Sequence, residues 1–186
     1  PLAVHKPLRC LEAEIAANEE VFAPPAGCMV LATVPPYHIY GLLYRILWPL
    51  ATQRPFSTEV ISYPEELHSA LREHSGCILV SSPAFLRRAL PALDLEQLKK
   101  FLGPVFSSGG PLPPAVAAEY NSITSTSVTE VYGSTETGGI AYRSVTDPEK
   151  PALWQPFPTV EIDVTPDQQS LSIRSPMLPV IDWTPA

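Results

Sequence analysis

The segment TEVYGSTETGGI, residues 129–140, places hydroxyls, a carboxylate and glycines directly after a predicted strand. Ser134 and Thr135 can donate hydrogen bonds to phosphate oxygens, and Glu136 offers the hard anionic oxygen that Mg²⁺ prefers. The glycines allow the backbone to approach a ligand closely. A plain glycine turn with a solvated glutamate uses the same residue types. The segment alone therefore leaves a phosphate site, a metal site and an ordinary turn open.

Two other loops carry residue types suited to a ligand. The loop SSGGPLPP, residues 107–114, can line a flat ring with bare backbone, although its prolines also suit a simple strand-to-helix connection. The loop PPYHIYG, residues 35–41, holds His38 between aromatic side chains, which fits either a ligand contact or a packed, hydrogen-bonded histidine. In an open parallel sheet, ligands bind beyond the carboxyl ends of the strands. Because all three loops follow predicted strands, we expect them to build one site.

The elements that would position these loops alternate between strand and helix. Short apolar runs with β-branched residues predict strands at 28–34, 58–63, 77–82, 103–108 and 126–133. Apolar residues at helical spacing, often opened by proline, predict helices or helical turns at 7–22, 42–50, 64–74, 83–93, 95–101 and 113–122. This alternation predicts an α/β fold with a mostly parallel sheet flanked by helices.

The character of the chain changes near residue 150. Residues 159–175, TVEIDVTPDQQSLSIRS, alternate around a turn cluster, PDQQ, which predicts an antiparallel β-hairpin at the C-terminal end. We therefore expect a partial α/β core over 1–150 and the start of a small β subdomain over 151–186.

Composition narrows the class of protein. A net charge of -7 and the lack of any Lys/Arg run argue against a nucleic-acid partner. Cys10, Cys28 and Cys77 show no C-x-x-C spacing, so we expect buried thiols in a reducing compartment and neither a disulfide framework nor a structural zinc site. No apolar run approaches the roughly 20 residues that span a bilayer, and no leader-like segment opens the sequence. We therefore expect a cytoplasmic protein without a membrane span.

The motif YGSTETGG after a strand, with SSGGPLPP and then PPYHIYGL upstream of it, resembles the adenylate-forming superfamily. This superfamily contains acyl- and aryl-CoA synthetases, adenylation domains and luciferase-like enzymes. The ordered set of three motifs is more specific than any one of them, and the resemblance covers nearly the whole chain. It implies an ATP-dependent ligase that activates a fatty or aryl carboxylic acid as acyl-AMP. The usual acceptor of the acyl group is the thiol of CoA or of the phosphopantetheine on an acyl carrier protein.

The resemblance implies a nucleotide site that holds ATP or AMP with Mg²⁺. Glu136 would bind Mg²⁺ on the phosphates, and Thr135 would hydrogen-bond the α-phosphate. Tyr132 would pack against adenine, and Glu130 occupies the position where the family often has Asn or Asp facing the adenine amino group. The remaining nucleotide contacts would come from Ser108, Gly109, Gly110, Pro111 and Gly133.

The resemblance also implies an acid site beside the nucleotide. His38 would stand at the carboxylate pocket near the reacting acyl group, and Gly133 and Gly138 would line the acyl pocket. A carboxylate oxygen would attack the α-phosphate, and pyrophosphate would leave. Because two anions approach each other, catalysis would rest on positioning and on neutralising charge. The catalytic residues would be Thr135, Glu136 and His38.

Several features of the superfamily are missing from the printed sequence. Its Gly/Ser/Thr-rich phosphate loop would precede Pro1, and Leu2 stands where the lysine of that loop is expected. A ribose-binding Asp should follow Trp183, and the small C-terminal domain with its catalytic lysine is absent from the sequence. We therefore expect an internal fragment that is inactive by itself although its parent is an enzyme. The alternatives are a non-catalytic nucleotide- or acyl-binding module with a degenerate site, and a parent that passes its acyl-AMP to a carrier protein or an amine.

Overall fold

The computed structural model of the chain contains two compact units. The core unit comprises Pro24–Glu130 and Arg143–Leu153, and the turn unit comprises Pro1–Ala23, Val131–Tyr142 and Trp154–Ala186. The residues that the structure describes are 4–74, 76–94, 99–123, 127–144, 150, 152–164, 170–180 and 182–185. The domain boundary expected between residues 150 and 151 remains a prediction.

A mainly parallel sheet carries the fold, which confirms the predicted α/β class. Its strands, in sheet order, are β1 (Val30–Ala32), β2 (Cys77–Ser81), β3 (Leu102–Ser107), β4 (Val128–Ser134), β5 (Gly138–Ser144) and β6 (Gln155–Pro156). β1 to β4 pair in parallel, with Leu31 opposite Leu79 and Ser107 opposite Glu130. β1, at the edge of the sheet, and β2 beside it are both buried along their whole length, as expected of parallel strands covered on both faces.

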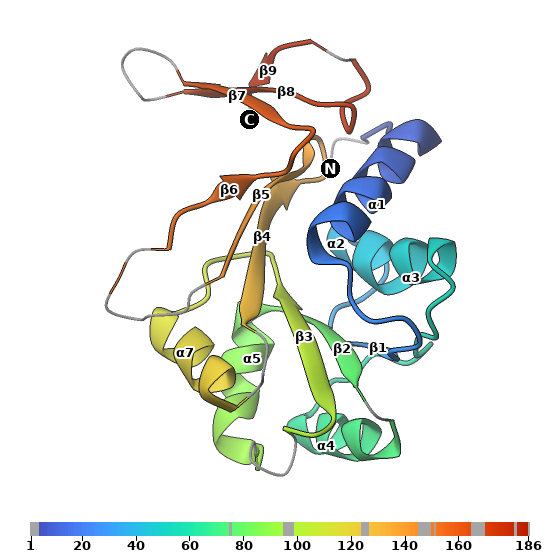
Figure 1. Ribbon diagram of the computed structural model, residues 1–186, viewed down its shortest axis with the longest axis vertical. Helices are drawn as coiled ribbons and strands as arrows, with labels where there is room; N and C mark the ends of the chain where they lie inside the picture. The colour runs from blue at the N-terminus through green and yellow to red at the C-terminus, as the bar shows by residue number, and fades with distance from the viewer. Residues whose placement is uncertain are drawn as a thin grey trace. The chain divides into compact units, whose positions relative to one another are not determined.

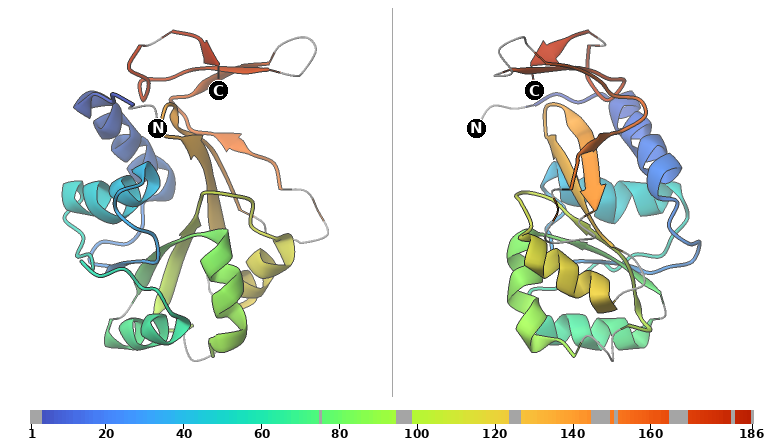
Figure 2. Two further views of the ribbon diagram at one scale, coloured as in Figure 1. Left: turned by 180° about the vertical axis from the view of Figure 1, so that it is seen from behind. Right: turned by 60° about the vertical axis from the view of Figure 1, so that its left-hand side comes forward.

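Three helices of the core unit gather around β2 and β3 (Figures 1 and 2). They are α4 (Pro64–Glu73), α5 (Pro83–Ala89) and α7 (Pro114–Ile123). Each begins at a proline, whose fixed φ and missing N–H suit the first turn of a helix. At the start of α4, the Glu66 carboxylate also accepts hydrogen bonds from the backbone N–H groups of Ser62, at 2.8 Å, and Tyr63, at 3.1 Å. Apolar side chains of the helices pack with those of the strands to form the core of the unit. The helical members include Leu67, Leu71, Leu86, Ala117 and Tyr120.

The helical segment 39–51 departs from the single helix predicted over 42–50. It consists of α2 (Ile39–Gly41), the π-helix η1 (Leu42–Leu47) and α3 (Trp48–Ala51). Pro49 has no N–H, so an ordinary α-helical ladder is interrupted there. The backbone N–H of Trp48 donates instead to the carbonyl of Leu43, one residue further back than in an α-helix.

The strand predicted at 58–63 is wrong. The structure has an isolated bridge between Val30 and Phe56 in this region. The backbone N–H groups of Ser57 and Ile61 each donate to a carbonyl of β1 at 2.9 Å. Within 58–63 only Ile61 is buried, so the segment runs beside the sheet without the alternating packed face that a strand requires.

Three other predicted elements differ at their ends. The strand predicted at 28–34 is confined to β1. In place of the helix predicted at 83–93, the α-helix α5 is followed by a 3₁₀ turn, η2 (Leu90–Ala92). The α-helix does not continue because Pro91 cannot donate a backbone hydrogen bond. Residues 95–98 of the predicted helical turn lie outside the described residues, and 99–101 form a turn.

The turn unit begins with α1 (Leu8–Phe22), which confirms the helix predicted at 7–22. The helix follows Pro7 and ends at Ala23, whose left-handed backbone conformation stops the helical path. The ring of Phe22 lies 5.3 Å from that of Tyr142, in an edge-to-face contact that packs the end of α1 onto β5.

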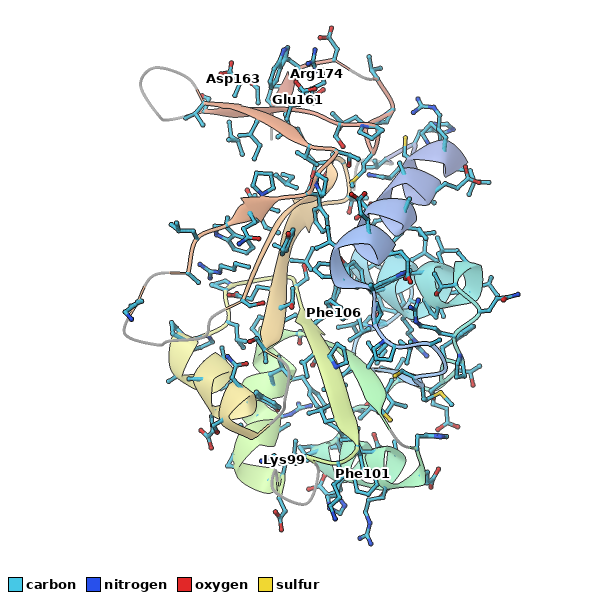
Figure 3. The ribbon with its side chains drawn as sticks, viewed as in Figure 1. Lys99, Phe101, Phe106, Glu161, Asp163 and Arg174 are labelled. Atoms are coloured by element: carbon cyan, nitrogen blue, oxygen red, sulfur yellow. The ribbon has the colours of Figure 1, made fainter. Side chains whose placement is uncertain are left out.

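A second, antiparallel sheet also belongs to the turn unit. Its strands are β7 (Glu161–Val164), β8 (Leu171–Arg174) and β9 (Thr184–Pro185). The pairing of Ile162 with Ile173 confirms the hairpin predicted over 159–175, although its PDQQ turn lies outside the described residues. Glu161 and Arg174 form an ion pair across the two strands (Figure 3).

The three cysteines are buried, as the sequence predicts, and their thiols are free. Burial raises the pKa of the Cys77 thiol to about 11, so this group stays protonated at neutral pH and is a poor nucleophile. Within the described part of the chain, no helix has the length and apolar character needed to cross a membrane.

Candidate functional site

The turn between β4 and β5 is held together by two of its own hydroxyls. The backbone N–H of Ser134 donates to Oγ1 of Thr137 at 3.0 Å, and the backbone N–H of Thr137 donates to Oγ of Ser134 at 3.2 Å. The Thr137 hydroxyl also donates to the carbonyl of Gly138 at 2.9 Å. Thr135 and Glu136 form the exposed tip of this turn. Ser134 is exposed as well but bonds within the turn, whereas Thr137 is buried.

Glu136 carries an ionised carboxylate at this tip. Its own backbone N–H and the Ser134 hydroxyl hydrogen-bond the carboxylate and lower its pKa, and the nearby Lys6 ammonium acts in the same direction. A carboxylate offers about four lone-pair positions, so these two bonds leave acceptor capacity open. Among the described residues, no cluster of three His, Cys, Asp or Glu could hold a metal ion. Mg²⁺ is usually held by one or two protein carboxylates plus substrate phosphates, and the role of Glu136 as such a ligand remains a prediction.

The two glycines predicted to line the acyl pocket are required by the turn itself. A Cβ on Gly133 would lie 2.2 Å from the carbonyl oxygen of Gly138, so β4 and β5 approach too closely there for any side chain. Gly138 has a φ of 75°, in the left-handed region that glycine adopts without strain. Their role toward an acyl group remains a prediction.

Tyr132 borders an apolar hollow within the turn unit. The side chain is 47% exposed, and its ring lies 5.6 Å from the ring of Trp154. The hollow has a volume of about 340 Å³ and is lined by Tyr132, Ile140, Ala141, Trp154, Ile162 and Leu171. An exposed aromatic face beside an apolar hollow is compatible with the predicted packing of Tyr132 against a flat ring.

The core unit holds the loop predicted to form an adenine wall. Residues 109–111 are exposed, whereas the residues that flank the loop, Ser107 and Leu112, are buried. Glu130 lies opposite Ser107 in the parallel ladder, and its side chain is buried. One carboxylate oxygen of Glu130 accepts the backbone N–H of Leu112 at 2.8 Å, and the other accepts Nε of Arg143 at 2.8 Å. The Glu130 side chain is therefore bonded to the protein through both oxygens.

His38 belongs to the core unit as well and is exposed. It directly precedes α2, where its carbonyl accepts the backbone N–H of Leu42 at 2.8 Å. The His38 ring lies 4.8 Å from that of Tyr37. Since β1 and β3 run parallel, the loops that carry His38 and Gly109 follow the same ends of their strands. The structure thus places two of the three predicted loops at one sheet edge.

Comparison with known proteins identifies the family. The family model described as AMP-binding enzyme matches residues 9–174. The chain belongs to this family. This confirms the resemblance to the adenylate-forming superfamily.

Two curated relatives of this chain are 4-coumarate–CoA ligases. The ligase of Cereibacter sphaeroides is 29% identical over 67% of this chain, and that of Rhodobacter capsulatus is 29% identical over 71%. The chain spans only 29% and 33% of their lengths. Among solved structures, the O-succinylbenzoate coenzyme A synthetase of Bacillus subtilis in complex with AMP has a TM-score of 0.79. That match has 17% identity, covers 94% of this chain and 38% of that one, and supports the fold alone.

Two further charged residues contact the turn, and the sequence alone does not point to either. Oε1 of Glu14 on α1 accepts the backbone N–H of Gly139 at 2.8 Å, and Nζ of Lys6 donates to the carbonyl of Thr135 at 3.4 Å. Both side chains therefore support the β4–β5 turn from outside it. The sequence holds only one indication of the role of Glu14. It lies at helical spacing from Cys10 and Ala17, which are also buried on α1.

Glu14 gives the stability of the protein a testable pH dependence. Burial raises the pKa of Glu14, while Lys6 and the Gly139 N–H act against this effect. The folded state therefore binds the proton more tightly than the unfolded state, whose pKa is near 4.5. We expect the stabilisation from protonated Glu14 to be complete below that value and to be lost as the pH rises through the folded-state pKa.

Urea unfolding of the full-length protein at pH 4.5 to 8 tests this expectation. Glu14→Gln should flatten the fall of the unfolding free energy over this range, because the replaced group no longer titrates. Glu12→Gln, at an exposed position on the same helix, should leave the slope unchanged. Identical slopes for wild type and Glu14→Gln would contradict the assignment.

Proposed function

We propose that the full-length protein containing this chain is an ATP-dependent ligase that activates a carboxylic acid as acyl-AMP. Membership of the AMP-binding enzyme family supports this function. The observation that carries it is the β4–β5 turn. Ser134 and Thr137 hydrogen-bond each other there, and Thr135 and Glu136 are exposed at the tip. This arrangement presents a hydroxyl and an ionised carboxylate together, as phosphate and metal recognition requires.

The proposed mechanism assigns each group a separate task. The acid's carboxylate oxygen bonds to the α-phosphorus of ATP, and the bond to the β-phosphate bridging oxygen breaks, so pyrophosphate leaves with its electron pair. Thr135 would donate a hydrogen bond to the α-phosphate as charge shifts, and Glu136 would hold Mg²⁺. When bound, Mg²⁺ supplies charge neutralisation on the phosphate oxygens. His38 would contact the acid near its reacting carboxylate.

Tyr132 of the turn unit would offer its ring to adenine, and the exposed backbone of residues 109–111 in the core unit would offer a wall to the nucleotide. The aromatic ring offers a flat apolar face, and the glycines leave the loop backbone open to close approach. The acyl group would then pass to a thiol of CoA or a carrier protein. The relatives' names favour CoA and an aryl acid as the first substrates to examine.

A pyrophosphate-release assay on the full-length protein tests the proposal. The panel comprises 4-coumarate, benzoate, short-chain and long-chain fatty acids, each with ATP and Mg²⁺. We expect release with at least one acid and only background release without acid. ATP binding measured by calorimetry, with no release for any acid, would instead identify a non-catalytic nucleotide-binding module and would overturn the proposal.

A further inference from the structure

The Glu130 carboxylate occupies an enclosed position in the core unit. The residue is 2% exposed, although it lies on β4 directly beside the end of β3. Its two oxygens accept hydrogen bonds from different directions, one from the Leu112 backbone and the other from the Arg143 guanidinium on β5. A buried carboxylate with two such donors is held firmly, because turning it toward a third group breaks a charge-assisted bond.

These bonds fix one end of the glycine loop. Ser107 is fixed by the β3–β4 ladder opposite Glu130. Leu112 is fixed by burial in the core and by the hydrogen bond from its N–H to Glu130. The exposed residues 109–111 therefore span a gap between two anchored points. The backbone hydrogen bond at the downstream anchor goes to a single carboxylate, which Arg143 in turn orients.

We infer that Glu130 is a positioning residue for the nucleotide, and that Arg143 acts through it. Glu130 sets the path of residues 109–111, and the backbone of that loop forms the wall of the nucleotide site. Glu130 does not itself contact the amino group of adenine. This inference rests on the proposed function, and it assigns Glu130 a role different from the amino-group contact that the superfamily resemblance implies.

A nucleotide that lacks the amino group separates the two roles. Calorimetry on the full-length protein would measure the affinities of ATP and of purine riboside triphosphate for wild type and for Glu130→Gln. For a positioning residue, we expect both affinities to fall together, on the order of 10- to 100-fold, with their ratio unchanged. For an amino-group contact, the variant would lose affinity for ATP alone, and the ratio would shift by a similar factor.

Variants at Arg143 keep the test decisive if Glu130→Gln folds poorly. The Arg143 side chain is 21% exposed, so Arg143→Met is expected to fold. It should raise KM for ATP and for the purine analogue alike and leave KM for the acid unchanged, whereas Arg143→Lys should restore part of the loss. Glu161→Gln, at the exposed ion pair of the hairpin, is the matched control and should change neither affinity.

Nucleotide binding by the wild type distinguishes a failure of the proposed function from a failure of this inference. A wild-type protein that binds neither nucleotide would overturn the proposed function and this inference with it. A wild-type protein that binds both, with either a changed ratio in Glu130→Gln or unchanged affinities in the Glu130 and Arg143 variants, would overturn the inference alone. A KM for the acid that rises as much as KM for ATP would show a general structural role and would also overturn it.

Discussion

Replacing Glu136 with alanine in the full-length protein is expected to slow pyrophosphate release by on the order of 10²- to 10³-fold. The reason is that Glu136 presents an ionised carboxylate at the exposed tip of the β4–β5 turn, where hydrogen bonds from its own N–H and Ser134 lower its pKa. Without it, the proposed Mg²⁺ ion loses its ligand from the turn. The measurement is the initial rate of release at saturating ATP and acid over a range of Mg²⁺ concentrations.

Two further measurements separate a metal ligand from a structural residue. Glu12→Ala removes an exposed carboxylate from the same unit and should keep full activity. Electron paramagnetic resonance with Mn²⁺ and ATP should show weaker metal binding in Glu136→Ala, with an unchanged unfolding midpoint. Full activity in Glu136→Ala, or unchanged Mn²⁺ binding, would remove Glu136 from the proposed site.

The second large effect is expected for Gly133→Ala. The new Cβ would lie 2.2 Å from the carbonyl oxygen of Gly138 and 3.1 Å from Cα of Gly139. Both atoms are backbone, so no side-chain rotation relieves the clash and the β4–β5 hairpin must open. We expect a loss of about 3 kcal/mol in the free energy of unfolding, measured by urea denaturation, at the upper end of the range for overpacked sites.

A second glycine distinguishes this clash from ordinary backbone strain. Gly27 has a φ of 80°, but a Cβ built there meets nothing within 4 Å. Gly27→Ala should therefore lose only about 1 kcal/mol, which reflects the left-handed conformation alone. Equal losses for the two variants would show that the close approach of β4 and β5 does not limit the site.

The sequence predicts the parts of the fold that local patterns encode. Proline followed by a helical apolar pattern correctly marks α4, α5 and α7, and buried apolar runs mark β2 and β3. The segment 58–63 has the composition of a strand but does not form one. Whether a β-branched segment joins a ladder depends on the neighbouring strand, and here β1 extends only over Val30–Ala32.

The sequence likewise predicts some residues of the candidate site and not others. Residue type and spacing are enough to single out Glu136 and Thr135, because both lie in one short motif. Glu14, Lys6 and Arg143 are not, since each acts on a turn or loop far away in the sequence. The partner of a buried charge is set by the tertiary fold, and helical spacing shows only that Glu14 lies on the buried face of α1.

The mutual bonding of Ser134 and Thr137 bears on the thermodynamics of recognition. Because each residue satisfies the other's backbone N–H, the turn is preorganised before a phosphate arrives. The conformational entropy of this segment is then lost during folding, and an incoming phosphate meets donors whose directions are already set. The exposed hydroxyl of Thr135 can thus engage a ligand while the bonds that shape the turn stay intact, so more of the binding energy is available to stabilise developing charge.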